Sequence, residues 1–232
     1  CINMLQSTSA SYLLMSSIDG ARSNLVSNGQ EQLSKALNLS RYAKARLNKV
    51  KGIKVVSTEC LNDEGVKFID ETKLCINVKR LNLTGLEVYD LLYKEFAVQA
   101  ELGDLYNILA LISIGTEKED VDKLINALEV ISKIYKKPDK INDIDIKQIN
   151  PILKLKPRDA FYKGKEMVLL DECIGRISGE SIMAYPPGIP IVTPGEIITK
   201  EIIDYIKLLK DNNAYLSDMK DKDLNYILVI KK

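Results

Sequence analysis

The sequence predicts a mixed fold of the α/β (α+β) class, in which short strands share compact units with amphipathic helices. Three observations predict it. Between residues 53 and 135, strand-like and helix-like runs follow one another in the order β-β-α-β-β-α. A second set of short apolar runs, with one more helix, follows a charged stretch at residues 136–157. The length of 232 residues also exceeds one average domain without reaching two large ones.

The first element is expected to be a helix from Asp19 to about Val50. Asp19 can cap its start, and apolar residues recur behind it at near-helical spacing. Gly52 follows a lysine-rich last turn, which is typical of a helix end. Residues 53–57, IKVVS, favour a strand because β-branched residues dominate them.

The following runs complete the β-β-α-β-β-α unit. Capping boxes at residues 84–87 (TGLE) and 116–119 (TEKE) each open a helix. Three more runs favour strands, the last two on either side of a turn at Gly103 and Asp104: residues 73–79, 97–102 and 107–114. We expect a compact sandwich with its helices on one face of a small sheet.

Beyond residue 135 the pattern becomes irregular. Residues 136–157 carry three prolines and much charge, so we expect a linker that runs over the surface. Pro157 fits the first position of a short helix. A helix at residues 199–211 and a last strand at residues 226–230 follow.

The segment AYPPGIPIVTPGE, residues 184–196, holds four of the chain's seven prolines. Its consecutive prolines favour an extended start, and Gly188 then gives the freedom to turn. Residues 189–192 favour an edge strand, because their proline cannot donate to a ladder. Residues 193–196, TPGE, fit a type II turn, and Thr199 would cap the following helix. On local grounds the segment is a rigid connector.

Composition and charge exclude several classes of protein. Lys and Arg number 33 against 32 Asp and Glu, so nothing directs the chain to nucleic acid or to an anionic membrane. No run approaches the roughly 18 apolar residues of a membrane helix. The N-terminus has neither an initiator Met nor the basic region of a signal peptide, so we expect a fragment that begins inside a longer chain.

Cysteine and histidine usage limits the chemistry. The four cysteines are scattered without a C-x-x-C pair, which favours free thiols in a cytoplasmic protein over a disulfide framework or a metal site. The chain contains no His, which excludes a His general base and His metal ligands. Any chemistry needs other groups, a cofactor or residues outside this chain.

One long stretch resembles a known family. GRISGESIMAYPPGIPIVTPGEIIT, residues 175–199, is similar to the C-terminal signature of the bacterial ornithine/lysine/arginine decarboxylases. These are pyridoxal 5'-phosphate (PLP) enzymes of the aspartate-aminotransferase fold, fold type I. Three further stretches resemble the same family in the same order along the chain: residues 4–22, 83–128 and 157–162.

The resemblance implies three parts. Residues 1–52 would be the end of the large PLP-binding domain and a connecting helix. Residues 53–137 would be the small α/β domain, and residues 138–232 a linker with the Orn/Lys/Arg decarboxylase C-terminal domain. Because the large-domain strands are missing, we expect Leu13, Leu14 and Ile18 to expose apolar surface and to promote self-association.

The resemblance also implies an activity. The full-length protein would be a cytoplasmic lyase of polyamine biosynthesis, a homodimer or higher homo-oligomer that converts arginine, lysine or ornithine into an amine and carbon dioxide with PLP. The family's Schiff-base lysine follows a His, so it would lie upstream, and the fragment would hold no catalytic residue and no activity. The alternative is a non-catalytic homologue that serves as a binding or regulatory protein.

The resemblance places the cofactor contacts near the N-terminus. Ser7 and then Thr8 match the position that contacts the PLP phosphate of the neighbouring subunit, and hydroxyls are suitable donors. Ala10 stands where the family usually has Pro, which loosens this loop. Without the resemblance, the stretch is an ordinary polar loop.

Five more residues are candidates for a substrate or a structural role. Arg176 and Glu180 could hold a carboxylate and a distal cation, or could form an internal ion pair. Glu101 and Asp104 would lie on the active-site side of the small domain, or serve only the turn. Tyr185 would line the active-site entrance or a subunit contact.

Overall fold

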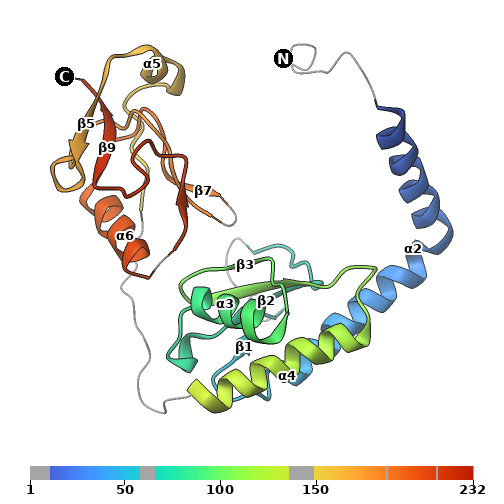
Figure 1. Ribbon diagram of the computed structural model, residues 1–232. Coiled ribbons are helices and arrows are strands. Elements are labelled where there is room, and N and C mark those ends of the chain that lie inside the picture. Colours follow the sequence, from blue (N-terminus) through green and yellow to red (C-terminus); the bar gives the residue numbers. More distant parts are fainter. Residues whose placement is uncertain (1–10, 58–65, 136–148, 186–187, 213, 232) are drawn as a thin grey trace.

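The computed structural model describes residues 11–57, 66–135, 149–185, 188–212 and 214–231. Figure 1 shows three parts along the chain: a long helix, a small sheet with two further helices, and a C-terminal group of short strands around one more helix. The mixed helix-and-sheet architecture agrees with the predicted fold class. The predicted linker falls largely outside the described residues, since these resume at residue 149.

The first helix, α2, runs from Tyr12 to Leu47, so the predicted start at Asp19 is wrong. Asp19 lies inside the helix, where its carboxylate pairs with Arg22 at 2.8 Å. Once a helix has formed, a residue with capping ability does not end it, because extension adds a hydrogen bond per residue. The end agrees with the sequence: Gly52 has a φ of +85°, a left-handed conformation that glycine adopts without strain.

Four antiparallel strands form a sheet in the order β1-β2-β4-β3. Their bounds are Lys54–Val55 (β1), Lys73–Asn77 (β2), Leu102–Gly103 (β3) and Asn107–Leu111 (β4). Along β2 and β4 every second residue is buried, namely Leu74, Ile76, Ile108 and Ala110. One face of the sheet therefore packs on the core, as the sequence predicts.

Helix α3, Gly85–Phe96, begins at the predicted capping box. The Thr84 hydroxyl accepts from the Glu87 amide at 3.2 Å, and the Glu87 carboxylate accepts from the Thr84 amide at 2.7 Å. The helix ends at Ala97, whose φ is +49°. This left-handed cap redirects the chain, so the strand predicted at residues 97–102 is wrong except for its last residue.

Helix α4, Lys118–Tyr135, carries the predicted buried stripe but lacks the predicted capping box at its start. The Thr116 hydroxyl accepts instead from the Ser113 amide at 2.9 Å, and the Glu117 amide donates to Asp120 at 3.0 Å. The apolar faces of α2, α3 and α4 share one hydrophobic core with the buried face of the sheet.

The C-terminal part combines two small antiparallel sheets with helix α6. Strand β5 pairs with β9, and β6 lies between β7 and β8. The short helix that starts at Pro157, the helix α6 and the last strand agree with the sequence. The bounds of the C-terminal elements are Pro157–Tyr162 (α5), Lys165–Leu169 (β5), Leu170–Glu172 (η3, a 3-10 turn), Ile182–Ala184 (β6), Ile189–Val192 (β7), Lys200–Asp211 (α6), Leu216–Ser217 (β8) and Tyr226–Ile230 (β9). A further 3-10 turn, η2 at Lys79–Leu81, lies between β2 and α3.

In the proline-rich segment, the extended start predicted at Pro186 and Pro187 lies outside the described residues, and the later predicted elements form in order. Gly188 has a φ of +90°, and β7 lies at the edge of its sheet. The Glu196 amide donates to the Thr193 carbonyl at 3.2 Å, which closes the predicted turn. Gly195 within it has a φ of +97°, and a Cβ there would lie 2.2 Å from the Leu155 carbonyl oxygen. Thr199 caps α6 through a 3.4 Å bond from the Ile202 amide.

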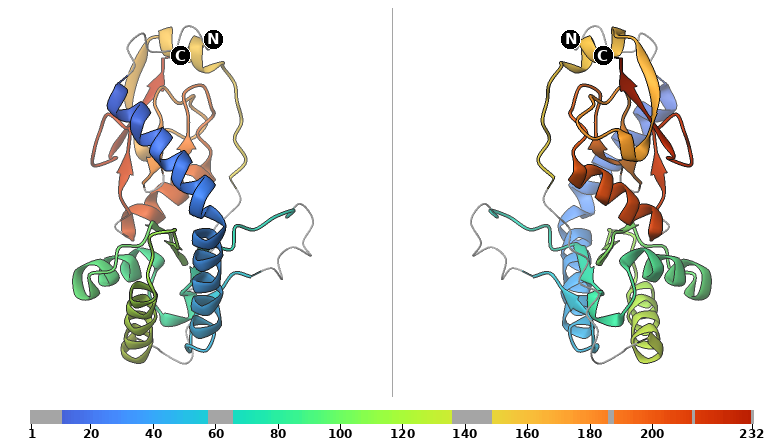
Figure 2. Two further views of the ribbon diagram at one scale, coloured as in Figure 1. Left: turned by 90° about the vertical axis from the view of Figure 1, so that its right-hand side faces the viewer. Right: turned by 90° about the vertical axis from the view of Figure 1, so that its left-hand side faces the viewer.

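A second hydrophobic core lies inside the C-terminal part, and the small sheet contributes to it. Leu105, in the turn between β3 and β4, is 3% exposed and packs with the buried residues of α6, β7 and β9. Figure 2 shows α6 directly beside the sheet layer in both views. The two parts of the molecule therefore meet where this turn contacts the C-terminal core.

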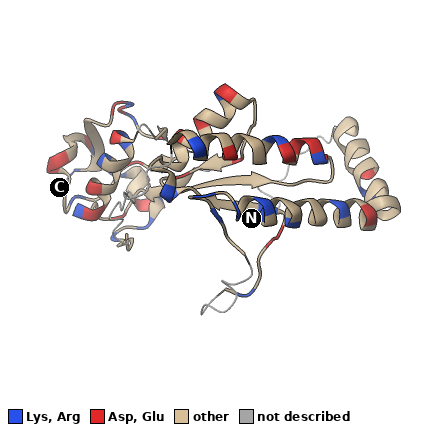
Figure 3. Ribbon diagram, turned by 90° about the horizontal axis from the view of Figure 1, so that it is seen from below, with Lys and Arg blue, Asp and Glu red and all other residues tan. Residues whose placement is uncertain are grey.

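Charged residues of both signs are intermixed on both parts, so the face in Figure 3 has no single sign of charge. Among the described residues, no helix combines the length and the apolar character needed to cross a bilayer.

Candidate functional site

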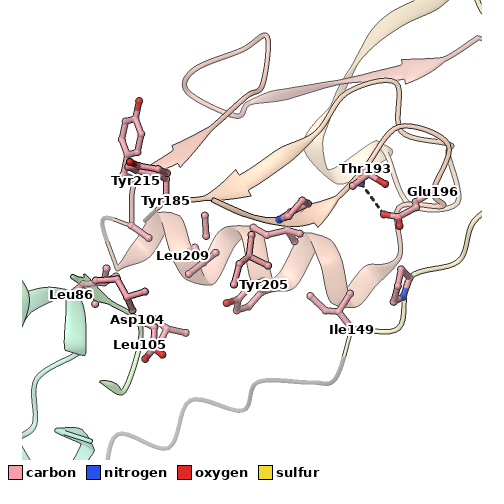
Figure 4. Close-up of a pocket in the computed structure, with 18 residues that line it drawn as sticks. Leu86, Asp104, Leu105, Ile149, Tyr185, Thr193, Glu196, Tyr205, Leu209 and Tyr215 are labelled. Atoms are coloured by element: carbon pink, nitrogen blue, oxygen red, sulfur yellow. Dashed lines mark hydrogen bonds between the residues drawn. The ribbon is translucent and has the colours of Figure 1, made fainter. Parts of the chain in front are cut away.

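A pocket of about 470 Å³ lies where the two parts of the molecule meet. Its described wall comes from the turn at residues 102–105, from the proline-rich segment 184–196, and from α6 with the residues that follow it. Figure 4 shows these segments around the pocket. Its volume is within the range of about 300–1,000 Å³ that is usual for small-molecule sites.

Asp104 provides a carboxylate at this pocket, and its position depends on the turn. One carboxylate oxygen, Oδ1, accepts from the backbone amides of Tyr106 and Asn107, both at 2.7 Å. The side-chain amide of Asn107 donates to both oxygens at 3.1 Å. The predicted structural role of Asp104 in the turn is therefore present, and the same carboxylate also lines the pocket.

Three tyrosines line the same pocket: Tyr185, Tyr205 and Tyr215. The rings of Tyr185 and Tyr215 meet edge to face, with 6.2 Å between centroids. Burial raises the pKa of Tyr205, and the negative charge of Asp104 raises it further. Tyr205 therefore stays a neutral phenol at neutral pH, within the electrostatic reach of Asp104.

Glu196 is the second carboxylate of the wall, and its contacts are local. It accepts from the Thr193 amide at 2.8 Å across the turn, the bond drawn in Figure 4. The described lining residues include no Lys or Arg. The pocket is thus an apolar cavity with aromatic rings and acidic groups, which suits a cation with an aliphatic body better than an anion.

Arg176 and Glu180 lie away from the pocket, and the Arg176–Glu180 ion pair considered above does not form. Arg176 instead pairs with Glu166 at 2.5 Å and donates to the Ile230 carbonyl at 2.9 Å, which ties β5 to β9. The Glu180 carboxylate is buried and accepts from the backbone amides of Lys220 and Leu228, both at 2.7 Å. Both side chains therefore make structural contacts inside the C-terminal part.

Of the remaining candidates, none but Asp104 and Tyr185 is among the described residues that line the pocket. Glu101 is exposed and is not among the described lining residues; it directly precedes β3, whereas Asp104 directly follows it. Ser7 and Thr8 lie outside the described residues. The structure therefore brings together two of the predicted residues, Asp104 and Tyr185.

Sequence reasoning missed Tyr205 and Tyr215. Tyr205 lies on α6 beside the buried stripe that Ile202, Ile206 and Leu209 form, so helical periodicity could have placed it near the core. Tyr215 follows the end of α6, and no local pattern marks it.

The described pocket does not fit PLP. That cofactor needs a lysine amine for its aldehyde and cationic or hydroxyl donors for its phosphate. The described wall has hydroxyls on Thr193 and three tyrosines, but it offers no lysine, and its two carboxylates would repel a phosphate. No group of three or more Asp, Glu, Cys or His side chains suited to a metal ion occurs within the described part of the chain.

Comparison with known proteins first defines the class of the C-terminal part. Residues 145–217 match the family model described as "Orn/Lys/Arg decarboxylase, C-terminal domain". The constitutive lysine decarboxylase of Escherichia coli has a similar structure, with a TM-score of 0.73 over 99% of this chain and 45% of that one, at 19% sequence identity. That likeness shows a shared fold.

The similarity to decarboxylases then extends over the whole chain. All of this chain aligns with an arginine decarboxylase of Bacillus subtilis at 41% identity, and the alignment covers 48% of that relative. The chain is 26% identical to a lysine decarboxylase of Hafnia alvei, over 52% of this chain and 22% of the relative. The resemblance seen in the sequence is confirmed: the C-terminal part matches the family model, and the chain is similar to arginine decarboxylases along its whole length. It spans about half the length of its curated arginine decarboxylase relatives.

Proposed function

We propose that this chain is the C-terminal part of a PLP-dependent decarboxylase that converts a basic amino acid into an amine and carbon dioxide. The single observation that carries the proposal is the 41% identity to an arginine decarboxylase, which extends over the whole chain. In this proposal the cofactor and its lysine belong to the rest of the protein, since the described pocket offers neither a lysine nor a phosphate site.

Arginine is the substrate that we propose. The similarity to the arginine decarboxylase of B. subtilis covers all of the chain at 41% identity, whereas the similarity to the lysine decarboxylase of H. alvei covers 52% at 26%. The higher identity over a longer part of the chain favours arginine over lysine.

The proposal assigns residues 1–52 to the end of the large PLP domain, residues 53–137 to the small domain and residues 138–232 to the C-terminal domain. Ser7 and Thr8 would contact the PLP phosphate of a neighbouring subunit in a cytoplasmic homo-oligomer. Exposed apolar side chains on α2, among them Leu13, Leu14 and Ile18, support such an assembly because they offer apolar surface to a partner.

The test compares the 232-residue chain with the longer protein that we propose. Both are purified with added PLP, and carbon dioxide release from L-arginine is measured. The longer protein is expected to release it in proportion to enzyme concentration, and the chain alone to release none. Release by the chain alone would contradict the proposal that the cofactor and its lysine belong to the rest of the protein. An inactive longer protein would favour the non-catalytic alternative.

A further inference from the structure

The pocket between the small sheet and the C-terminal part has a chemistry that the proposed decarboxylation does not use. We propose that it binds a linear aliphatic amine, such as a diamine or polyamine, with Asp104 as the counter-ion of one ammonium group. This inference goes beyond the proposed function, because it concerns which ligand this pocket binds and depends only on the wall of the pocket.

The charge of the wall is the first reason. Asp104 is held by two amide bonds to Oδ1, whereas the hydrogen bond of its Oδ2 among the described residues comes from the Asn107 side chain. A carboxylate oxygen can accept more than one bond, so Oδ2 retains capacity for an ammonium donor. Among the described lining residues no Lys or Arg competes for this carboxylate.

The aromatic and apolar surfaces are the second reason. Tyr185, Tyr205 and Tyr215 are among the lining residues, and a ring face attracts a cation within about 6 Å. Leu105 and Leu209 offer apolar contact for a methylene chain between two charged ends. Figure 4 shows that Asp104 and the Tyr185–Tyr215 pair come from opposite parts of the molecule, with α6 alongside.

The acidic wall of the pocket also favours binding of an amine over binding of an amino acid. The carboxylate of arginine, lysine or ornithine would enter a cavity whose described wall lacks a cation and carries Asp104 and Glu196. Burying an unpaired carboxylate beside like charges is unfavourable. An amine that has lost this group meets no such penalty, so the pocket favours the product class of a decarboxylase over its substrate class.

The test measures binding to the 232-residue chain by isothermal titration calorimetry, without cofactor and without turnover. The probes are 1,4-diaminobutane, the neutral 1,4-butanediol and L-arginine. The diamine is expected to bind at least about tenfold more tightly than either of the others, since a charge-assisted bond is worth about that factor. Equal binding of diamine and diol, or the absence of diamine binding, overturns the proposal.

Variants then locate the site. Asp104→Asn keeps an oxygen acceptor for the turn but removes the charge, and is expected to weaken diamine binding about tenfold. Glu101→Gln is the matched control, because this exposed carboxylate at the other end of β3 is not among the described lining residues, so the diamine affinity of this variant should stay unchanged. An unchanged affinity in Asp104→Asn, or an equal loss in Glu101→Gln, overturns the assignment.

A second variant is independent of the turn. Tyr185 is 54% exposed, and in Tyr185→Leu its ring is lost without disturbing a buried residue. Diamine affinity should fall severalfold in Tyr185→Leu and be retained in Tyr185→Phe, which keeps a ring. Equal affinities in these two variants overturn the aromatic contribution. None of these results depends on decarboxylation, so an inactive longer protein leaves the amine site testable.

Discussion

Glu180 is a buried carboxylate that two backbone amides hold from opposite sides of the C-terminal part. The Lys220 and Leu228 amides each donate to one of its oxygens at 2.7 Å. In Glu180→Gln the side-chain NH₂ must face one of these donors, which leaves a buried amide unpaired. We expect the free energy of unfolding to fall by about 2 kcal/mol, measured by urea denaturation.

Glu101→Gln serves as the control for this change. Glu101 is exposed, so the same substitution should alter the free energy of unfolding by less than about 0.5 kcal/mol. If Glu180→Gln proved as stable as the control, the carboxylate would have no structural role, and a role in ligand binding would regain support.

Asp221 links acid stability to a loop that precedes β9. The backbone amide of Tyr226, with those of Asp223 and Asn225, holds the pKa of Asp221 below its usual value. A lowered pKa in the folded state means that the ionised carboxylate stabilises the protein above the unfolded pKa of about 3.9. This contribution is lost as the pH falls through the folded pKa.

The measurement compares Tm for the native chain and Asp221→Ala between pH 7 and pH 2. The native chain should have the higher Tm at pH 5 to 7, and the difference should shrink below about pH 4 as the carboxylate is protonated. A difference that stays constant down to pH 2 would show that the charge of Asp221 does not stabilise the loop.

Some residues of the candidate site could be predicted from the sequence, and others could not. Asp104 and Tyr185 could be selected as polar or aromatic residues in a turn and beside prolines, and both line the pocket. The partner of Arg176 could not, because Glu166 lies opposite it only after β5 and β9 have paired. The resemblance to the family adds Ser7 and Thr8, whose contacts stay a prediction.

At the scale of elements, Gly85 fixes how α3 meets the turn that carries Asp104. A Cβ at this position would lie 2.1 Å from the Asn107 carbonyl oxygen and 2.5 Å from that of Asp104. Both are backbone atoms, so Gly85→Ala must displace the turn. We expect the free energy of unfolding to fall by about 2 kcal/mol or more, measured by thermal or urea denaturation.

Gly20 offers the opposite case in helix α2. An added Cβ meets nothing within 4 Å there, and Gly20 lies inside the helix. Gly20→Ala should therefore stabilise the chain by about 0.5–1 kcal/mol, because alanine loses less backbone entropy. If Gly85→Ala were also stabilising, the close approach of α3 and the turn would be incorrect.

Several local signals predicted the structure correctly, although the capping box predicted at residues 116–119 does not form. The capping box at residues 84–87, the turn at residues 193–196 and the cap at Thr199 depend on neighbours within three positions. The predicted strand at residues 97–102 failed because a left-handed cap at Ala97 leaves little of the run to pair with β4. Pairing partners and helix starts depend on longer-range packing, which short windows of sequence do not contain.

At the scale of the whole molecule, the N-terminal half of α2 extends beyond the small sheet and its helices in Figure 1. Leu13 is 82% exposed, Leu14 66% and Ile18 69%, so the predicted exposure is confirmed. We expect the 232-residue chain to self-associate through this surface, with a sedimentation coefficient that rises with protein concentration.

Charge substitutions identify the surface responsible. The double variant Leu14→Glu/Ile18→Glu should sediment as a monomer over the same concentration range. Ile134→Glu, on α4, is the matched control, because Ile134 is also 66% exposed but lies elsewhere. A native chain that remains monomeric, or a control that dissociates as the double variant does, would contradict this role for α2.

The pocket is a property of the whole molecule that local sequence patterns could not predict. Its wall combines the β3–β4 turn with α6 and the proline-rich segment, which are far apart along the chain. Leu105, which packs into the C-terminal core, and Tyr106, which packs against it, bring them together. The family, in contrast, was recognisable from the sequence because the 175–199 stretch is long and specific.

The central claim is that this chain completes an arginine decarboxylase. The most direct measurement is kcat/KM of the longer protein, saturated with PLP, for carbon dioxide release from L-arginine, L-lysine and L-ornithine. We predict the highest value for arginine. A higher value for lysine or ornithine would contradict the proposed substrate, and no release from any of the three would contradict the proposed decarboxylase.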